Sequence, residues 1–112
     1  MKITCHCGST ILDSADALPH KAHLIPDQEW LSLLDALDSA IEQSGPSPRE
    51  KEAVCMRLRT RISEISRQAW QCRDCGRVYV ERADRQLEPL FPGSDDIPRE
   101  LFRSRTSEEP TT

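Results

Sequence analysis

Four cysteines stand in two short pairs that are far apart in the sequence. Cys5 and Cys7 occur in the run Cys-His-Cys-Gly, and Cys72 and Cys75 occur in Cys-Arg-Asp-Cys-Gly. Zinc binds four thiolates in a tetrahedron, and a site closed by four protein ligands is structural rather than catalytic. In the second turn, the glycine after Cys75 permits the backbone conformation that turns amides toward the thiolates. The spacing therefore predicts a four-cysteine metal site, with zinc as the expected ion.

Several other residues could alter this ligand set. The first pair is one residue shorter than the second, which leaves open a site without metal or with free thiols. His6 lies between two ligands, and we expect its side chain to point away from the metal. His20 and His23 are expected in a loop, where they could serve as spare ligands. Cys55 lies on the apolar side of a predicted helix, and we expect a buried, small hydrophobic residue there.

The two cysteine turns resemble the knuckles of zinc-ribbon and rubredoxin-like proteins. Tyr79, three residues beyond the second glycine, also fits that class, and the resemblance covers about a quarter of the chain. The resemblance implies a ligand role for Cys5, Cys7, Cys72 and Cys75. Rubredoxins bind iron and transfer electrons, so a rubredoxin-like electron carrier is an alternative function. Rubredoxins usually have two Cys-x-x-Cys loops and more aromatic residues, so zinc is favoured over iron here.

Short strands are expected around both cysteine pairs. Residues 1–4 and 9–12 read as two strands that flank the first turn, and residues 77–81 are rich in strand-forming side chains. Trp70 leads into the second turn, so a second hairpin is expected with the metal turn at its tip. Residues 13–26 read as a loop. The predicted fold class is α+β, a small zinc ribbon with a helical insertion.

The first predicted helix starts near Asp27, which follows a proline and could cap the free amides. Gly45 and the proline after it are expected to end this helix. Its apolar residues recur at helical spacing: Trp30, Leu33, Leu34, Leu37, Ala40 and Ile41. Asp35, Asp38 and Glu42 form an acidic row on another face.

The second predicted helix starts at a capping box formed by Ser47 and Glu50, with a proline at the first helical position. Its apolar stripe consists of Val54, Leu58, Ile62, Ile65 and Ala69. The short link predicts that the two helices form an antiparallel hairpin, inserted at about residues 27–69.

The remaining sequence is polar and proline-rich. We expect a single domain over residues 1–103, a short helix over residues 96–102 and a disordered tail over residues 104–112. Three apolar residues are expected to dock on the core: Leu87, Leu90 and Phe91. Aromatic residues are scarce, so the core is small and a metal ion would supply much of the folding free energy.

Composition and motifs exclude several classes of protein. The 112 residues carry a net charge of −4, whereas general nucleic-acid binders are usually basic. The first residues lack the apolar region of a signal peptide, and no run is long enough to span a membrane, so a cytoplasmic location is expected. There is no glycine-rich phosphate loop and no His-Glu-x-x-His motif. We therefore expect a protein without catalytic activity.

Two classes of binding function fit better. The favoured one is a zinc-stabilised protein-interaction module whose acidic helix suits a basic partner, with an immunity or inhibitor protein as its most specific form. The alternative is a nucleic-acid-associated zinc ribbon, supported by a group of arginines: Arg57, Arg59, Arg61, Arg67, Arg73 and Arg77. The identity of the partner and the oligomeric state are left open.

Overall fold

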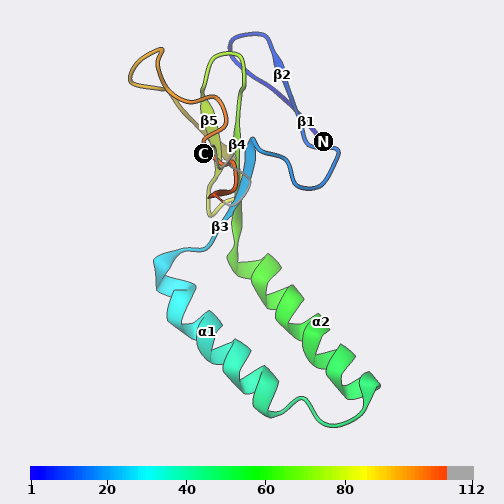
Figure 1. Cartoon of the computed structure of the whole chain (residues 1–112). Coiled ribbons are helices and arrows are strands. Elements are labelled where there is room, and N and C mark those ends of the chain that lie inside the picture. The colour runs from blue at the N-terminus through cyan, green and yellow to red at the C-terminus, as the bar shows by residue number, and fades with distance from the viewer. Residues whose placement is uncertain (106–112) are drawn as a thin grey trace, which may run out of the picture. The chain divides into compact units, whose positions relative to one another are not determined.

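The computed structural model describes residues 1–105 and has the α+β fold that the sequence predicts. In chain order the elements are β1 (Lys2–Thr4), β2 (Thr10–Leu12), β3 (Lys21–Leu24), α1 (Asp27–Glu42), α2 (Pro48–Ile65), β4 (Arg67–Gln71), β5 (Val78–Glu81) and β6 (Leu87–Leu90). Figure 1 shows the two helices inserted between β3 and β4.

Two antiparallel strand pairs carry the cysteine turns at their tips. Strands β1 and β2 pair with Ile3 opposite Ile11, and strands β4 and β5 pair with Trp70 opposite Tyr79. All four of these side chains are buried. The predicted hairpins around the two turns are therefore confirmed, and each buries its apolar residues directly behind a cysteine pair.

The second hairpin belongs to a larger sheet than the sequence predicts. The order of its strands is β3-β4-β5-β6, so the segment expected to be a loop before α1 contains β3, and His23 lies in that strand. Strand β6 was also missed, because Pro89 argues against a strand. Proline is tolerated at a sheet edge, where its missing N–H breaks no ladder bond, and β6 is such an edge.

The helices begin close to their predicted positions, with corrections at the ends. Pro26 is the N-cap of α1 and no side chain caps that end, so the expected cap at Asp27 is wrong. The helix ends at Glu42, before Gly45, which adopts a positive φ of 76° in the link. Ala69, expected in the second helix, is fully buried in β4.

The capping box at the start of α2 is confirmed in both directions. The backbone N–H of Glu50 donates to Ser47 Oγ at 3.1 Å, and the backbone N–H of Ser47 donates to Glu50 Oε2 at 3.4 Å. These bonds satisfy two amide groups at the helix start that would otherwise lack a partner.

The chain divides into two compact units, one formed by Met1–His23 with the chain from Gln68 onward and the other by Leu24–Arg67. In the first unit the buried cluster surrounds the cysteines: Ile3, Cys5, Ile11, Trp70, Cys72 and Tyr79. Within the helices of the second unit, Leu33 and Val54 are buried. The prediction that Cys55 is buried is wrong, because it lies about 100° around the helix from Val54 and is exposed.

The segment after β6 forms turns rather than the short helix predicted at residues 96–102. Leu87 packs against the buried cluster as expected. Leu90 and Phe91 do not dock as expected, because both are exposed, Phe91 by 61%. Beyond residue 105, the predicted tail lies outside the described residues.

The fully buried side chain of Gln71 in β4 forms hydrogen bonds that hold the segment after β6 against the sheet. Its Nε2 donates to the Pro98 carbonyl oxygen at 2.7 Å and to the Gly76 carbonyl oxygen at 3.3 Å. The backbone N–H of Leu101 donates to Gln71 Oε1 at 2.8 Å. One amide thus satisfies three backbone groups from two segments.

Replacing Gln71→Leu should release the segment after β6. The change leaves three backbone groups without their partner and should lower the free energy of unfolding by roughly 1–3 kcal/mol. Limited trypsin digestion measures the release as faster cleavage after Arg99 and Arg103. Gln86→Leu, in an exposed turn, is the control and should digest like the parent. Equal cleavage rates in Gln71→Leu and the parent would contradict this role.

Candidate metal centre

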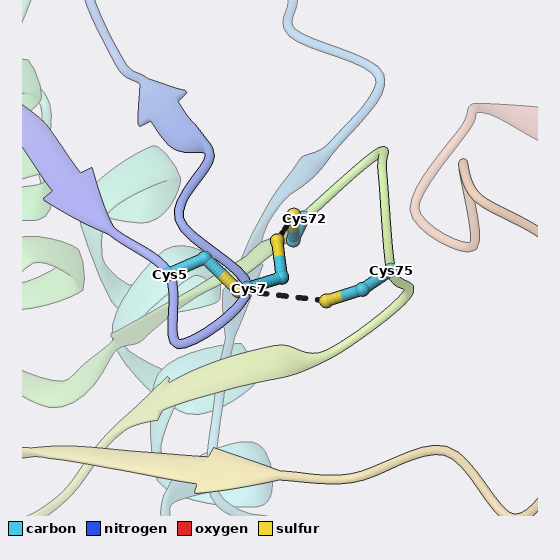
Figure 2. A group of neighbouring side chains, drawn as sticks. All are labelled: Cys5, Cys7, Cys72 and Cys75. Carbon is cyan, nitrogen blue, oxygen red and sulfur yellow. Dashed lines mark hydrogen bonds between the residues drawn. The ribbon is translucent and has the colours of Figure 1, made fainter.

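The two turns bring four sulfur atoms together. Figure 2 shows the four cysteine side chains directed toward one another from two separate turns. Cys5 Sγ lies 3.5 Å from Cys75 Sγ, and Cys7 Sγ lies 3.6 Å from Cys72 Sγ. All four sulfurs lie within 4.8 Å of one another. The two cysteine pairs therefore meet as the sequence predicts, each sulfur of one turn close to a sulfur of the other.

These distances fit a tetrahedral metal ion and not a disulfide. Four sulfurs each about 2.3 Å from a central zinc ion lie about 3.8 Å from one another, close to the 3.5 and 3.6 Å observed. A disulfide bond would place two sulfurs about 2.05 Å apart, and all five cysteines are free. The four cysteines are thus arranged compatibly with a metal-binding knuckle.

The two turns use the same hydrogen bonds although they differ in length by one residue. In the first, the Cys5 N–H donates to the Ser9 carbonyl and the Gly8 N–H donates to the Cys5 carbonyl, at 2.8 and 2.9 Å. In the second, the Cys72 N–H donates to the Arg77 carbonyl and the Gly76 N–H donates to the Cys72 carbonyl, at the same distances. The shortened pair therefore still forms a closed turn.

Glycine is required in both turns by the backbone. Gly8 has a φ of 94° and Gly76 a φ of 84°, a region that side chains with a Cβ rarely occupy. A Cβ on Gly76 would also lie 2.8 Å from the side chain of Ile97. The glycine after each cysteine pair is therefore part of the structure that presents the sulfurs.

Tyr79 links strand β5 to the first cysteine turn. Its hydroxyl donates to Cys5 Sγ at 3.4 Å and accepts from the backbone N–H of His6 at 3.1 Å. Burial would raise the pKa of the Cys5 thiol, but hydrogen bonds from the Cys7 backbone and from Tyr79 lower it to about 6. A buried hydroxyl thus favours the thiolate form that binds metal.

Arg77 supplies positive charge beside the sulfurs. Its Nη1 lies 3.8 Å from Cys75 Sγ, and its guanidinium carbon lies 4.6 Å from the ring centre of Phe91. The His6 ring stacks on Phe91 with 6.2 Å between centres. This contact was missed from the sequence, where Arg77 was assigned to a strand and to the arginine group that supports nucleic-acid binding. Its place two residues after Cys75 is the signal that could have indicated it.

Cys72 and Cys7 represent the two extremes of exposure among the ligands. Burial raises the pKa of the Cys72 thiol to about 12, although backbone amides of Cys75 and Asp74 favour its thiolate. Cys7 is exposed. A metal ion would have to displace the proton of Cys72, so metal binding should release protons and strengthen as the pH rises.

No histidine joins the sulfur cluster within residues 1–105. The exposed ring of His6 contacts Tyr79 and Phe91 instead. His20 is buried, and its Nε2 lies 2.8 Å from the Leu12 carbonyl oxygen, which requires a proton on that nitrogen. The three histidines are therefore held elsewhere or lie apart from the sulfurs.

Fold and site together define a small α+β protein with a four-cysteine knuckle and a helical hairpin between its two cysteine turns. The chain belongs to the family described as Domain of unknown function (DUF8617), whose model matches residues 1–105. No curated protein and no solved structure matches the chain. Neither helix among the described residues has the length and apolarity needed to cross a membrane.

Replacing Cys72→Ser should abolish tight zinc binding and the folding of the unit that contains the cysteines. Structural zinc supplies roughly 10–16 kcal/mol of apparent binding free energy, which stabilises the folded state. Native mass spectrometry gives zinc per chain, and near-ultraviolet circular dichroism reports on Trp70 and Tyr79. Cys55→Ser, at an exposed position, is the matched control and should keep zinc and melt like the parent. A Cys72→Ser variant with parental zinc content and melting would refute the four-ligand site.

Replacing Tyr79→Phe should weaken zinc binding without abolishing folding. The change removes one hydrogen bond to Cys5 Sγ and leaves the His6 amide without its partner, and loss of such outer contacts typically costs at least about tenfold in affinity. Competition with a chromophoric chelator measures the affinity. The tetrahedral thiolate spectrum of the cobalt-loaded variant should be retained, which separates weaker binding from loss of the site. Unchanged zinc affinity would show that this hydroxyl does not support the centre.

Proposed function

We propose that this chain is a non-catalytic, cytoplasmic protein-interaction module in which a structural zinc ion joins the two cysteine turns. The observation that carries the proposal is the helical hairpin, whose helices bury Leu33 and Val54 while a stripe of large apolar side chains remains exposed. The sulfur cluster supports the structural role of the metal. Free cysteines suit the reducing cytoplasm, where paired cysteines more often bind metal than form disulfides.

The donor set favours zinc in a structural role. Four sulfurs fill a tetrahedron and leave no position for a water molecule or a substrate, which catalytic zinc requires. The same four sulfurs could bind iron, but divalent zinc binds such sites more tightly than ferrous iron. Zinc tetrathiolate is colourless and iron tetrathiolate is not, so metal analysis with absorbance of the purified protein decides between the module and an electron carrier.

The exposed stripe on α1 supports protein binding. Trp30, Leu34, Leu37 and Ile41 are separated by four, three and four residues, which places them along one side of the helix. All four are exposed. A continuous row of large apolar side chains on a helix usually marks a surface that another protein covers. The nearby acids Asp35, Asp38 and Glu42 are also exposed, as the sequence predicts.

The arginines give less support to nucleic-acid binding, because three of them have partners within the chain. Arg61 lies 3.7 Å from a Glu29 carboxylate oxygen and donates to Ser32 Oγ at 3.0 Å. Arg73 pairs with Glu100. Arg77 contacts Phe91 and a cysteine sulfur. These three guanidinium groups already have partners within the chain and are less available to bind the phosphates of a nucleic acid. This favours the protein-interaction module.

Photo-crosslinking tests the proposal at single positions. A photoreactive residue at Ile41, 68% exposed on the stripe, should give a discrete crosslinked protein in cells that express the chain. The same residue at Met56, a similarly exposed apolar position outside the stripe, is the matched control and should give none. Adducts at both positions, or at neither, would contradict a specific protein-binding surface on α1.

A further inference from the structure

The helical hairpin has two sides that differ in character. One side forms a groove lined mostly by small and polar residues: Ala36, Ser39, Ala40, Gln43, Val54, Arg57, Leu58 and Arg61. On the helical wheel the other side carries the stripe of α1 together with Cys55 and Ile62 of α2. We name this side the open face, and its residues are Trp30, Leu34, Leu37, Ile41, Cys55 and Ile62, all of them exposed.

The charges of the two helices are segregated. Helix α1 contains five acidic residues and no basic one: Asp27, Glu29, Asp35, Asp38 and Glu42. Helix α2 contains five basic residues, Arg49, Lys51, Arg57, Arg59 and Arg61, and three acidic ones, Glu50, Glu52 and Glu64. Because Arg57 and Arg61 line the groove, the basic edge beside the open face consists of Lys51 and Arg59. A surface with one acidic and one basic edge is complementary to a copy of itself turned by half a revolution.

We infer that the open face binds the open face of a second copy of this chain, so that two hairpins form an antiparallel four-helix bundle. This inference rests on the proposed function, because it uses the same exposed stripe, and it names the partner. Each α1 would lie against α2 of the second copy, with the stripe of α1 packed on Cys55 and Ile62. The bundle would bury the apolar side chains that a lone hairpin leaves in water.

The register within one hairpin shows which charges would meet. Arg61 contacts both Glu29 and Ser32, which fixes the level of α2 beside α1. Counting along both helices from that level places Arg59 level with residues 31–34, beside Asp35, and Lys51 level with residues 39–42, beside Asp38 and Glu42. A two-fold axis parallel to the helices keeps these levels, so acids of one copy would face bases of the other along the outer edge.

The other two-fold arrangement of the same faces is unfavourable. An axis perpendicular to the helices would place α1 against α1 and would bring the acidic row of one copy, Asp35, Asp38 and Glu42, close to the same row of the other. Like charges held close together repel and suppress the wrong pairing. The charge pattern therefore selects one of the two symmetric arrangements.

Sedimentation analysis of the full, zinc-loaded chain tests the inference. The parent should show a monomer–dimer equilibrium. Ile41→Glu buries a charge in the open face and should raise the dissociation constant at least about tenfold, a loss of 1.4 kcal/mol. Met56→Glu adds the same charge at a position that is 54% exposed and outside the open face, and it should dimerise like the parent. Equal effects of the two variants would overturn the inference.

A charge exchange tests the pairing of α1 with α2. The variant Asp35→Lys with Asp38→Lys makes both edges basic, and the variant Lys51→Glu with Arg59→Glu makes both edges acidic. Each variant alone should be monomeric, and an equimolar mixture should form a heterodimer, detected by native mass spectrometry. Failure of the mixture to pair, while the parent dimerises, would overturn the proposed arrangement.

The outcomes for partner and surface can be separated. A crosslink from Ile41 with the mass of two chains supports both proposals. If the parent stays monomeric while Ile41 crosslinks to a different protein, the proposed dimer is wrong and the proposed protein-interaction module is supported. A monomeric parent without any crosslink from Ile41 overturns both.

Discussion

The meeting of four sulfur atoms from two distant turns is the constraint on which the rest of the structure depends. Cys5 and Cys7 come from the first hairpin, Cys72 and Cys75 from the second, and the sulfurs lie at spacings suited to one tetrahedral ion. The buried cluster of this unit consists of the cysteines and the residues directly behind them. A core of that size stabilises a fold weakly by itself, so a metal ion bound by the four sulfurs would add much of the stability of the two hairpins.

The surroundings of the sulfurs connect the two cysteine turns to strand β5 and to the chain after β6. Tyr79 of β5 donates to Cys5, Arg77 approaches Cys75, and Phe91 after β6 lies under the guanidinium of Arg77. Gln71, next to Cys72, binds the last described segment. A four-thiolate zinc centre would carry a net negative charge, which these donors and the nearby cation would offset. The same contacts that shape the ligands also order the chain around them.

Patterns of local chemistry predicted much of this arrangement. The cysteine pairs with their glycines, the capping box at Ser47 and the apolar period of both helices each act over a few residues, and each gave the right element. Strands β3 and β6 were missed because they form through pairing with neighbouring strands and not through a strong local sequence pattern. Strand β3 consists of half-exposed residues beside β4, and β6 contains Pro89 at a sheet edge. The burial of Cys55 was wrongly predicted because helical spacing shows only which side of the helix a residue lies on. Whether that side is buried depends on which other elements pack against it.

Strands β3 and β4 are neighbours in the sheet, and the helical hairpin leaves from one and returns through the other. The spacing of adjacent strands, about 4.8 Å, therefore fixes the two points at which the insertion is attached. The backbone hydrogen bonds that close the two cysteine turns join residues outside the insertion. Such an attachment makes the hairpin an exchangeable part. Its length and surface can change by whole helical turns during evolution, or by design, while the four-cysteine cluster and its sheet keep the same sequence and geometry.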